Sequence, residues 1–367
     1  MTPLARAAGI IESGHSVRAA ICSWGYSLDE ARSYDDVREA VDDGIFELLA
    51  EVGVAIVAPG QPRSRPESAD TPRSEAMLRP AAPCRHTLSK LLRVSAQTRH
   101  SEMLRDADRR TATRIRSAGG PTAGKSLVAP ASLQQTHFTD EQFIEVLRWR
   151  LGCTQPELQA RCQNFVASTG ECCNEQLDAH GDHAVICSYG PLRIKTHDQY
   201  ADYVAEILCE TDAHVRREVW VKEFSTPAAD AWLDVWAFGG MTVQDVLIDV
   251  TIRHPMATAY QPIASQEDGA AASKAEAAKV DRYPARGGRS VTPFAVETWG
   301  RLGETAEHAL EEFAAEATRH KRLRGFDANA ASFLRRWRAC LDAVLSKGVA
   351  RSLTAARHGL PGRAVHR

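Results

Sequence analysis

The hydrophobic positions in the C-terminal half of the chain change from helical to strand-like spacing and back. Residues 197–208 (HDQYADYVAEIL) carry apolar side chains at helical spacing. Apolar, β-branched runs then predict four strands, and Ala-rich or amphipathic stretches predict further helices. We expect strands at 215–224, 231–238, 246–252 and 291–298, and helices at 271–284, 303–323 and 328–352. The pattern predicts a mixed α/β (α+β) core in which the helix over 197–208 packs on a sheet.

The N-terminal part gives weaker signals. Residues 29–57 combine a helical pattern with a strand-like end, and residues 58–75 are rich in Pro, Ser and Arg, as in a disordered linker. Residues 84–116 show an Arg-rich helical pattern with one thin apolar stripe. We therefore expect a helical segment over 1–57, a linker over 58–80 and a helical linker region over 81–168.

One helix in this part is well defined at both ends. Thr139 and Gln142 have the spacing of a capping box, and Gly152 provides a stop. Its apolar positions are Phe143, Val146, Leu147 and Leu151. We expect this stripe to pack on the body of the protein.

The composition is that of an ordinary protein with a packed core. The chain has 367 residues, of which 44% are hydrophobic and 25% charged. These values exclude collagen-like, wholly disordered and disulfide-scaffold classes, and the length favours two units with connecting segments. No apolar run approaches the roughly 20 residues that cross a bilayer. We expect a soluble intracellular protein with no membrane partner.

The charge is distributed unevenly. The formal net charge is −2, but residues 319–367 hold twelve Lys and Arg against two acids, so this segment is +10 and the remainder is −12. Such a segment suits a phosphate-rich partner, although a solvated helical end explains it equally well. The candidate nucleic-acid-binding residues are Lys321, Arg322, Arg335, Arg336 and Arg338.

Residues 119–126 (GGPTAGKS) satisfy the written pattern of a phosphate-binding loop. That loop works when a buried strand feeds it and a helix leaves it, so that backbone N–H groups converge on phosphate. Here the preceding residues are polar and basic, and Pro130 follows soon after Ser126. Nucleotide binding is therefore the weakest of three functional hypotheses.

A cysteine and histidine cluster lies at 170–187 (GECCNEQLDAHGDHAVIC), in a chain with nine cysteines. Zinc takes four Cys or His ligands from short loops, so we expect a zinc site formed by Cys172, Cys173, His183 and Cys187. Adjacent cysteines in extended backbone point in different directions, so His180 or Cys162 could substitute for one of them. The alternative is a set of buried cysteines beside surface histidines.

Acidic residues interrupt two apolar strand runs at 230–252. Asp234 and Asp249 flank a Gly239-Gly240 turn, and acids in such strands need a cation, a partner or solvent. Two on neighbouring strands predict a shared Mg²⁺. Downstream, Lys274 and Lys279 lie in the Ala-rich helix, and Glu297 ends the last strand. The alternatives are surface acids on an edge strand and lysines on a solvated helix.

In this order, the features resemble the C-terminal region of site-specific non-LTR retrotransposon proteins, in which a zinc knuckle precedes a restriction-like endonuclease. The resemblance covers residues from about 110 to about 350. The matching segments are LRWRLG (147–152), LDAHGDHAVIC (177–187), HDQYADYVAEIL (197–208), WLDVWAFG (232–239), LIDVTIRHP (247–255), KVDRYP (279–284) and FAVETWG (294–300). It implies a zinc knuckle at 169–190, a PD-(D/E)XK core at 191–300, and basic C-terminal helices and tail at 301–367.

The resemblance also implies roles for single residues. Asp234 and Asp249 match the metal-binding acids, and Thr251 stands where the wider superfamily has lysine. Lys279 matches the displaced lysine of this lineage, and Glu297 a supporting glutamate. Cys173, His183 and Cys187 match zinc ligands, whereas the family's first cysteine position holds Glu171 here, so that Cys172 would have to shift.

The implied activity is a Mg²⁺- or Mn²⁺-dependent endonuclease that nicks DNA for target-primed retrotransposition, in the nucleus. DNA is the expected partner, with element RNA and a reverse transcriptase encoded elsewhere as further candidates. No polymerase-like stretch precedes residue 110, so we expect a tail or domesticated piece of a longer element. The alternative is a catalytically inactive, zinc-containing nucleic-acid-binding remnant.

Overall fold

A computed structural model describes residues 97–129, 134–156, 158–166, 169–227, 229–239 and 245–359. The predictions for 1–57 and 58–80 therefore lie outside the described residues. The chain divides into two units, Met1–His100 and Ser101–Arg367. The second unit contains the segments expected to form the knuckle, the core and the C-terminal helices.

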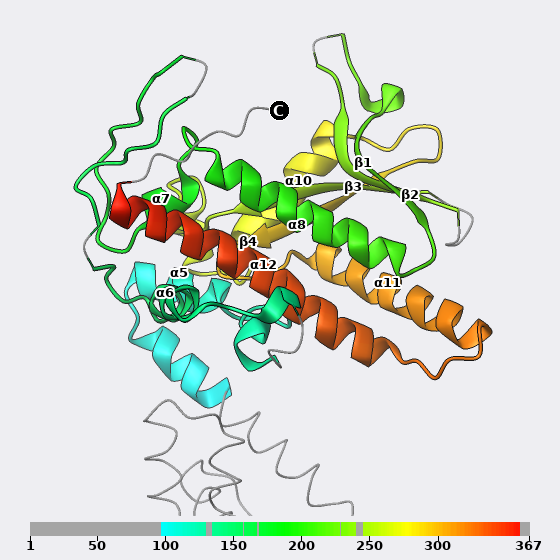
Figure 1. Ribbon diagram of the computed structural model, residues 1–367, viewed down its shortest axis with the longest axis horizontal. Coiled ribbons are helices and arrows are strands. Elements are labelled where there is room, and N and C mark those ends of the chain that lie inside the picture. The colour runs from blue at the N-terminus through cyan, green and yellow to red at the C-terminus, as the bar shows by residue number, and fades with distance from the viewer. Residues whose placement is uncertain are drawn as a thin grey trace, which may run out of the picture. The chain divides into compact units, whose positions relative to one another are not determined.

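A four-stranded mixed sheet forms the centre of this unit (Figure 1). The strands lie in the order β1-β2-β3-β4, with β1–β2 and β2–β3 antiparallel and β3–β4 parallel. The parallel pair is largely buried because helices cover both faces, whereas one face of β1 is exposed. The strands are β1 (His214–Trp220), β2 (Trp232–Phe238), β3 (Val246–Arg253) and β4 (Val291–Glu297).

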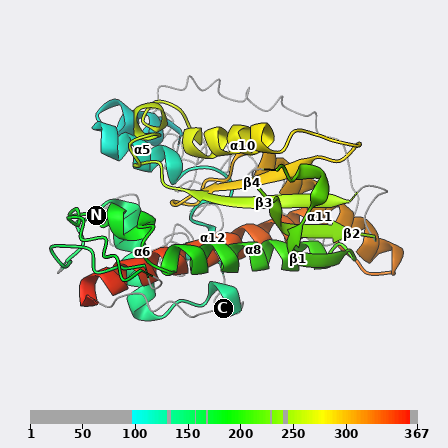
Figure 2. The ribbon, with the colours of Figure 1, turned by 90° about the horizontal axis from the view of Figure 1, so that it is seen from above.

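Helices cover the sheet on two sides (Figure 2). Helix α10 (Ala270–Arg282) packs on β3 and β4 from one side. On the other side α8 (Leu192–Cys209) packs against the first three strands, and α12 (Ala330–His358) packs on α8. Helix α11 (Glu304–Leu323) contacts β4 and α12. The main core lies between the sheet and α8, α11 and α12, and it includes Tyr200, Ile207, Ile248, Phe294, Leu310, Trp337 and Leu341.

The mixed α/β class predicted from the sequence is confirmed. The predicted strand over 215–224 ends early at Trp220, because Lys222–Phe224 forms a 3-10 turn (η3) that buries Phe224. Helix α8 begins before the expected residue 197, with Pro191 at its N-cap, and α12 continues past residue 352.

Most of the remaining elements pack on α12, and the other two pack on each other. Helix α6 has the predicted capping box at Thr139 and ends at Gly152, whose φ of 73° favours glycine. It buries Val146 and Trp149, whereas Phe143 and Leu151 are exposed, so the buried stripe differs from the predicted one. These elements are α5 (Arg109–Ser117), η1 (Lys125–Val128), η2 (Gln134–Thr136), α6 (Asp140–Leu151), α7 (Asp182–Ile186) and α9 (Gln261–Ala264).

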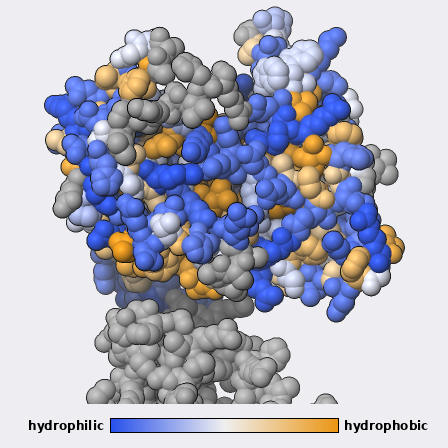
Figure 3. Space-filling model, in the orientation of Figure 1, coloured by the Kyte–Doolittle hydropathy of each residue, from blue (hydrophilic) through white to orange (hydrophobic). Residues whose placement is uncertain are grey.

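The surface seen in Figure 3 is mainly hydrophilic, with apolar residues scattered among polar ones. The largest exposures of apolar side chains include Leu323 at 79% and Phe326 at 61%, both at the connection between α11 and α12. Within the part of the chain that the structure describes, no helix has the length and apolar character needed to span a bilayer.

Candidate active site and metal centre

The expected metal-binding acids lie where β2 and β3 separate. The pairing of these strands ends at Val235–Ile248, and the same register carried one residue further places Asp234 opposite Asp249. Beyond that point the backbone N–H of Val250 is released from β2 and donates to Asp234 Oδ2 at 2.6 Å. The fork between the strands therefore fixes the first acid next to the second.

Lys279 reaches this fork from α10. Its Nζ lies 2.7 Å from Asp249 Oδ2, and both side chains are mostly buried. Lys274, the other candidate, is exposed one turn earlier and donates to the carbonyl of Ala259. Of the two lysines, only Lys279 joins the acids.

His197, in the first turns of α8, completes the cluster and was missed as a site residue from the sequence. Its Nε2 lies 3.1 Å from the Val250 carbonyl and 3.6 Å from Asp234 Oδ2. Burial opposes protonation of His197, but the hydrogen bond and charge of Asp234 outweigh it and raise the pKa to about 9. The signal available in the sequence was a polar residue at the start of an otherwise core-facing helix.

The two carboxylates differ in their ionisation. Burial raises the pKa of Asp249, which is 5% exposed, although the Lys279 charge opposes this. Burial also opposes ionisation of Asp234, but the hydrogen bond and charge of His197 and the Val250 N–H outweigh it and lower its pKa. Two adjacent carboxylates whose pKa values are shifted in opposite directions are typical of a site that a bound cation would stabilise.

The cluster opens into a surface pocket. Besides the acids, Lys279 and His197, its lining includes two arginines, Arg193 from α8 and Arg253 from the end of β3. The pocket is therefore open to solvent on one side and rimmed by cationic side chains. This arrangement can bind an anion next to a metal held by the acids.

Glu297 does not join the pocket. It is 1% exposed, and its Oε1 accepts hydrogen bonds from the backbone N–H groups of Ala271 and Ala272, at the N-terminus of α10. Through these two hydrogen bonds it holds the start of the helix that carries Lys279. Glu297 was grouped with the catalytic residues as a supporting glutamate, and its place outside the pocket corrects this to a positioning role.

The Cys/His cluster forms between a two-stranded ribbon and α7. Backbone bonds from Cys162 to Glu175 and from Cys173 to Asn164 join the two arms of the ribbon, which carry one cysteine each. Helix α7 supplies His183, and Cys187 follows at its C-cap. The four ligand atoms of Cys162, Cys173, His183 and Cys187 lie within 4.8 Å of one another.

The separations fit a tetrahedral zinc site. Cys162 Sγ lies 3.7 Å from Cys187 Sγ, and Cys173 Sγ lies 3.3 Å from His183 Nε2. Zn–S bonds of about 2.3 Å place two sulfur ligands about 3.8 Å apart, whereas a disulfide joins them at about 2.05 Å. This set of three thiols and one imidazole could hold a metal such as zinc.

Electrostatics within the cluster favour a cation. Burial raises the pKa of Cys162 and of Cys173. Burial also opposes ionisation of Cys187, but hydrogen bonds from His183 and Asn164 outweigh it and lower its pKa. One thiolate is thus already favoured beside His183, and a bound metal would displace the remaining thiol protons.

Cys172 lies outside the cluster, which corrects its assignment as a ligand. It is exposed, and its Sγ is 3.7 Å from the carbonyl of Gly170. Neighbouring residues on an extended arm point to opposite faces, so only Cys173 faces the site. Cys162, which the sequence left open as a substitute, takes the fourth position.

The segment with the phosphate-loop pattern binds a carboxylate of the protein itself. The backbone N–H groups of Gly124 and Ser126 each donate to Asp342 at 3.0 Å, and the Ser126 hydroxyl and Arg150 also contact this carboxylate. Asp342 is 1% exposed, so it fills the position that a phosphate would need. The arrangement argues against nucleotide binding at this segment.

The candidate basic residues of the C-terminal segment fall into two groups. Arg336 pairs with Glu210, and Arg338 pairs with Glu307 and Glu311, so both are neutralised within the fold. The other three, Lys321, Arg322 and Arg335, are exposed. The positive charge that this segment offers to a partner is therefore smaller than its sequence suggests.

The chain matches no protein-family model. A search of curated proteins also found no match.

Proposed function

We propose that this protein is a metal-dependent endonuclease that hydrolyses a phosphodiester bond in one strand of DNA. The observation that carries the proposal is the convergence of Asp234, Asp249 and Lys279, from three separate elements, on one open pocket. Carboxylates and a lysine that only completed surface ion pairs would not need a shared, partly buried site.

The donor set at the fork suits a hard divalent cation. Asp234 and Asp249 would hold Mg²⁺ or Mn²⁺, which take carboxylate oxygens and retain several waters. When bound, the ion would offset the negative charge that develops on the phosphoryl group and favour a nucleophilic water.

The chain's own residues supply the remaining functions. Lys279 places a positive charge beside Asp249, where it can orient a water molecule and stabilise a phosphate oxygen. His197 holds the Asp234 carboxylate and the Val250 carbonyl in place. Glu297 fixes the start of α10 and so the position of Lys279.

The finer fold assignment, a PD-(D/E)XK restriction-endonuclease-like core, belongs to the same proposal. It is supported by an antiparallel pair of strands that carries the acids, followed by a parallel crossover whose helix carries the lysine. On this basis we propose a retroelement-derived nuclease that nicks chromosomal DNA in the nucleus. The Cys/His centre would belong to the same element-derived unit.

Nicking of supercoiled plasmid in Mg²⁺ tests the proposal. The wild type should convert supercoiled to open-circular DNA, whereas Asp234→Asn and Lys279→Met should each slow this at least about 100-fold, as expected for loss of a metal ligand or a charge-stabilising group. Lys274→Met, on the exposed side of the same helix, is the matched control. DNA binding without nicking by the wild type would favour the catalytically inactive remnant instead.

A further inference from the structure

Arg253 is a cation in the pocket without a partner for all of its donors. It is the last residue of β3 and lines the pocket together with the acids and Lys279. Its Nε is buried and has no hydrogen-bond acceptor, and no carboxylate among the described residues forms an ion pair with it. A guanidinium without an acidic partner, in a pocket that also holds Lys279, favours an anionic ligand that its terminal nitrogens could bind.

The residue after Arg253 is held rigidly. His254 is 3% exposed, and its Nδ1 lies 2.7 Å from the hydroxyl of Thr298. Its ring packs against both Trp149 and Trp299, with centroid distances of 5.7 Å and 5.1 Å. The backbone carbonyl of Arg253 also accepts a hydrogen bond from Thr298. The direction in which the Arg253 side chain leaves β3 is therefore set by its surroundings.

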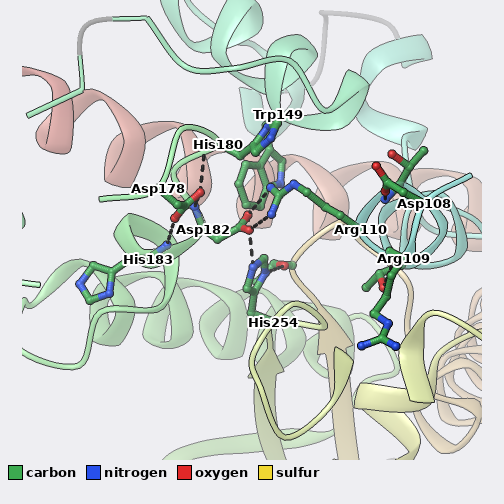
Figure 4. A network of polar contacts seen from close by, with 12 residues as sticks. Asp108, Arg109, Arg110, Trp149, Asp178, His180, Asp182, His183 and His254 are labelled. Atoms are coloured by element: carbon green, nitrogen blue, oxygen red, sulfur yellow. Dashed lines mark hydrogen bonds and ion pairs between the residues drawn. The ribbon is translucent and has the colours of Figure 1, made fainter. Parts of the chain in front are cut away.

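Those surroundings reach the Cys/His centre through His254, which faces Asp182 of α7 (Figure 4). His254 Nε2 lies 3.4 Å from Asp182 Oδ1, and Arg110 of α5 binds the same carboxylate with both terminal nitrogens. Asp182 directly precedes the metal ligand His183 on α7, and Figure 4 shows the two side chains pointing away from each other. Helix α7 therefore carries the ligand His183 on one side and the contact between Asp182 and His254 on the other.

Helix α7 is held along one side by packing, because Ala184 and Val185 are buried in the core cluster that includes Trp299 and Leu353. It spans five residues, and its start is fixed by Asp178, whose carboxylate accepts bonds from the backbone N–H groups of His180, Asp182 and His183. A helix of this length is not stable alone in water. A metal bound by His183 and Cys187 would hold both ends of α7 and so keep Asp182 facing His254.

We propose that Arg253 binds a backbone phosphate of DNA in the pocket, and that the Cys/His centre keeps Arg253 in place through Asp182 and His254. The identity of the ligand rests on the proposed nuclease function. Arg253 is the binding residue, and Asp182 and His254 are positioning residues. The zinc centre would thus stabilise the position of a pocket residue, in addition to any contact of its own with nucleic acid.

Fluorescence anisotropy with a duplex oligonucleotide tests the first part, using the zinc-loaded full chain with Ca²⁺ in place of Mg²⁺ to prevent cleavage. Arg253→Ala should weaken binding about tenfold and lower the slope of log affinity against log salt by about 1, as expected for one lost phosphate contact. Arg253→Lys should retain the slope. Arg109→Ala is the control, because Arg109 is exposed and Figure 4 shows it pointing away from Asp182. An unchanged slope in Arg253→Ala, or an equal fall in Arg109→Ala, would overturn the assignment.

A double-mutant cycle tests the coupling. Asp182→Asn should also weaken binding about tenfold, and the Asp182→Asn/Arg253→Ala pair should remain near tenfold, whereas independent effects would multiply to about 100-fold. Removal of zinc by a chelator gives the same comparison without a substitution at Asp182. It should lower the DNA affinity of the wild type and should lower that of Arg253→Ala little further. Multiplying effects in both experiments would overturn the coupling. These readouts do not depend on cleavage, so a wild type that binds in this way without nicking would refute only the nuclease proposal.

Discussion

Replacing Cys162 and Cys172 one at a time distinguishes the observed metal centre from the one that the sequence suggested. Cys162 is buried, with its Sγ 3.7 Å from Cys187 Sγ, whereas Cys172 is exposed and outside the cluster. Cys162→Ser should therefore remove a zinc ligand, and Cys172→Ser should remove none.

The magnitude follows from the number of ligands. Structural zinc sites bind with about 10–16 kcal/mol, so one of four ligands corresponds to roughly 3 kcal/mol, or a loss of affinity of at least about 100-fold. At a free zinc concentration about 100-fold above the wild-type dissociation constant, the wild type would gain about 2.7 kcal/mol of stability from the metal and Cys162→Ser less than about 1 kcal/mol.

Competition with a chromophoric chelator gives the zinc affinity, and urea unfolding with and without zinc gives the stability. The wild type and Cys172→Ser should each bind one zinc with the same affinity and gain the same stability. Equal loss in the two variants, or loss in Cys172→Ser alone, would refute the assignment of Cys162. Absence of zinc from the wild type would refute the centre itself.

Three further predictions concern residues outside the metal centre. Lys125→Ala should leave the melting temperature unchanged with or without added nucleotide, because Asp342 occupies the loop, and a nucleotide-dependent shift that the variant abolishes would contradict this. Asp342→Asn should lower the free energy of unfolding in urea by about 3 kcal/mol, because it leaves Arg150 buried without its charge partner, and a loss below about 1 kcal/mol would argue against that pairing. Burial raises the pKa of Glu297, so the folded state favours its neutral form, and the resulting stability is largest below the ordinary glutamate pKa and falls as the pH rises through the raised value. Glu297→Gln should flatten that part of the pH dependence of unfolding, and an unchanged pH profile would contradict the shift.

The elements that form the sheet and its covering helices were predictable because their sequences carry strong periodic signals. The Val- and Ile-rich run of β3 and the Ala-rich run of α10 each support a single interpretation. Element ends were less predictable, since the stop at Trp220 depends on the burial of Phe224 in a turn that has no periodic signal of its own.

The two acids were predictable because carboxylates in apolar strands are conspicuous. The Ala-rich helix offered both Lys274 and Lys279, and only the family resemblance singled out Lys279. His197 and Arg253 were not predictable, because their roles depend on where α8 begins and where β3 ends in space. Glu297 was named for its type and position, but only its bonds to Ala271 and Ala272 show that it acts on a helix. The sequence could not show that Cys162 and not Cys172 completes the cluster, because this depends on how the two arms of the ribbon pair.

The Mg²⁺-dependent rate of plasmid nicking by Asp249→Asn, relative to the wild type, tests the assignment of the acid–lysine pocket most directly. Asp281→Asn, an exposed acid on α10, is the matched control. We expect nicking by the wild type and by Asp281→Asn at the same rate, and a fall of at least about 100-fold in Asp249→Asn, because loss of one carboxylate weakens the metal site. Equal nicking by all three proteins, or nicking by none of them, would contradict the proposed function.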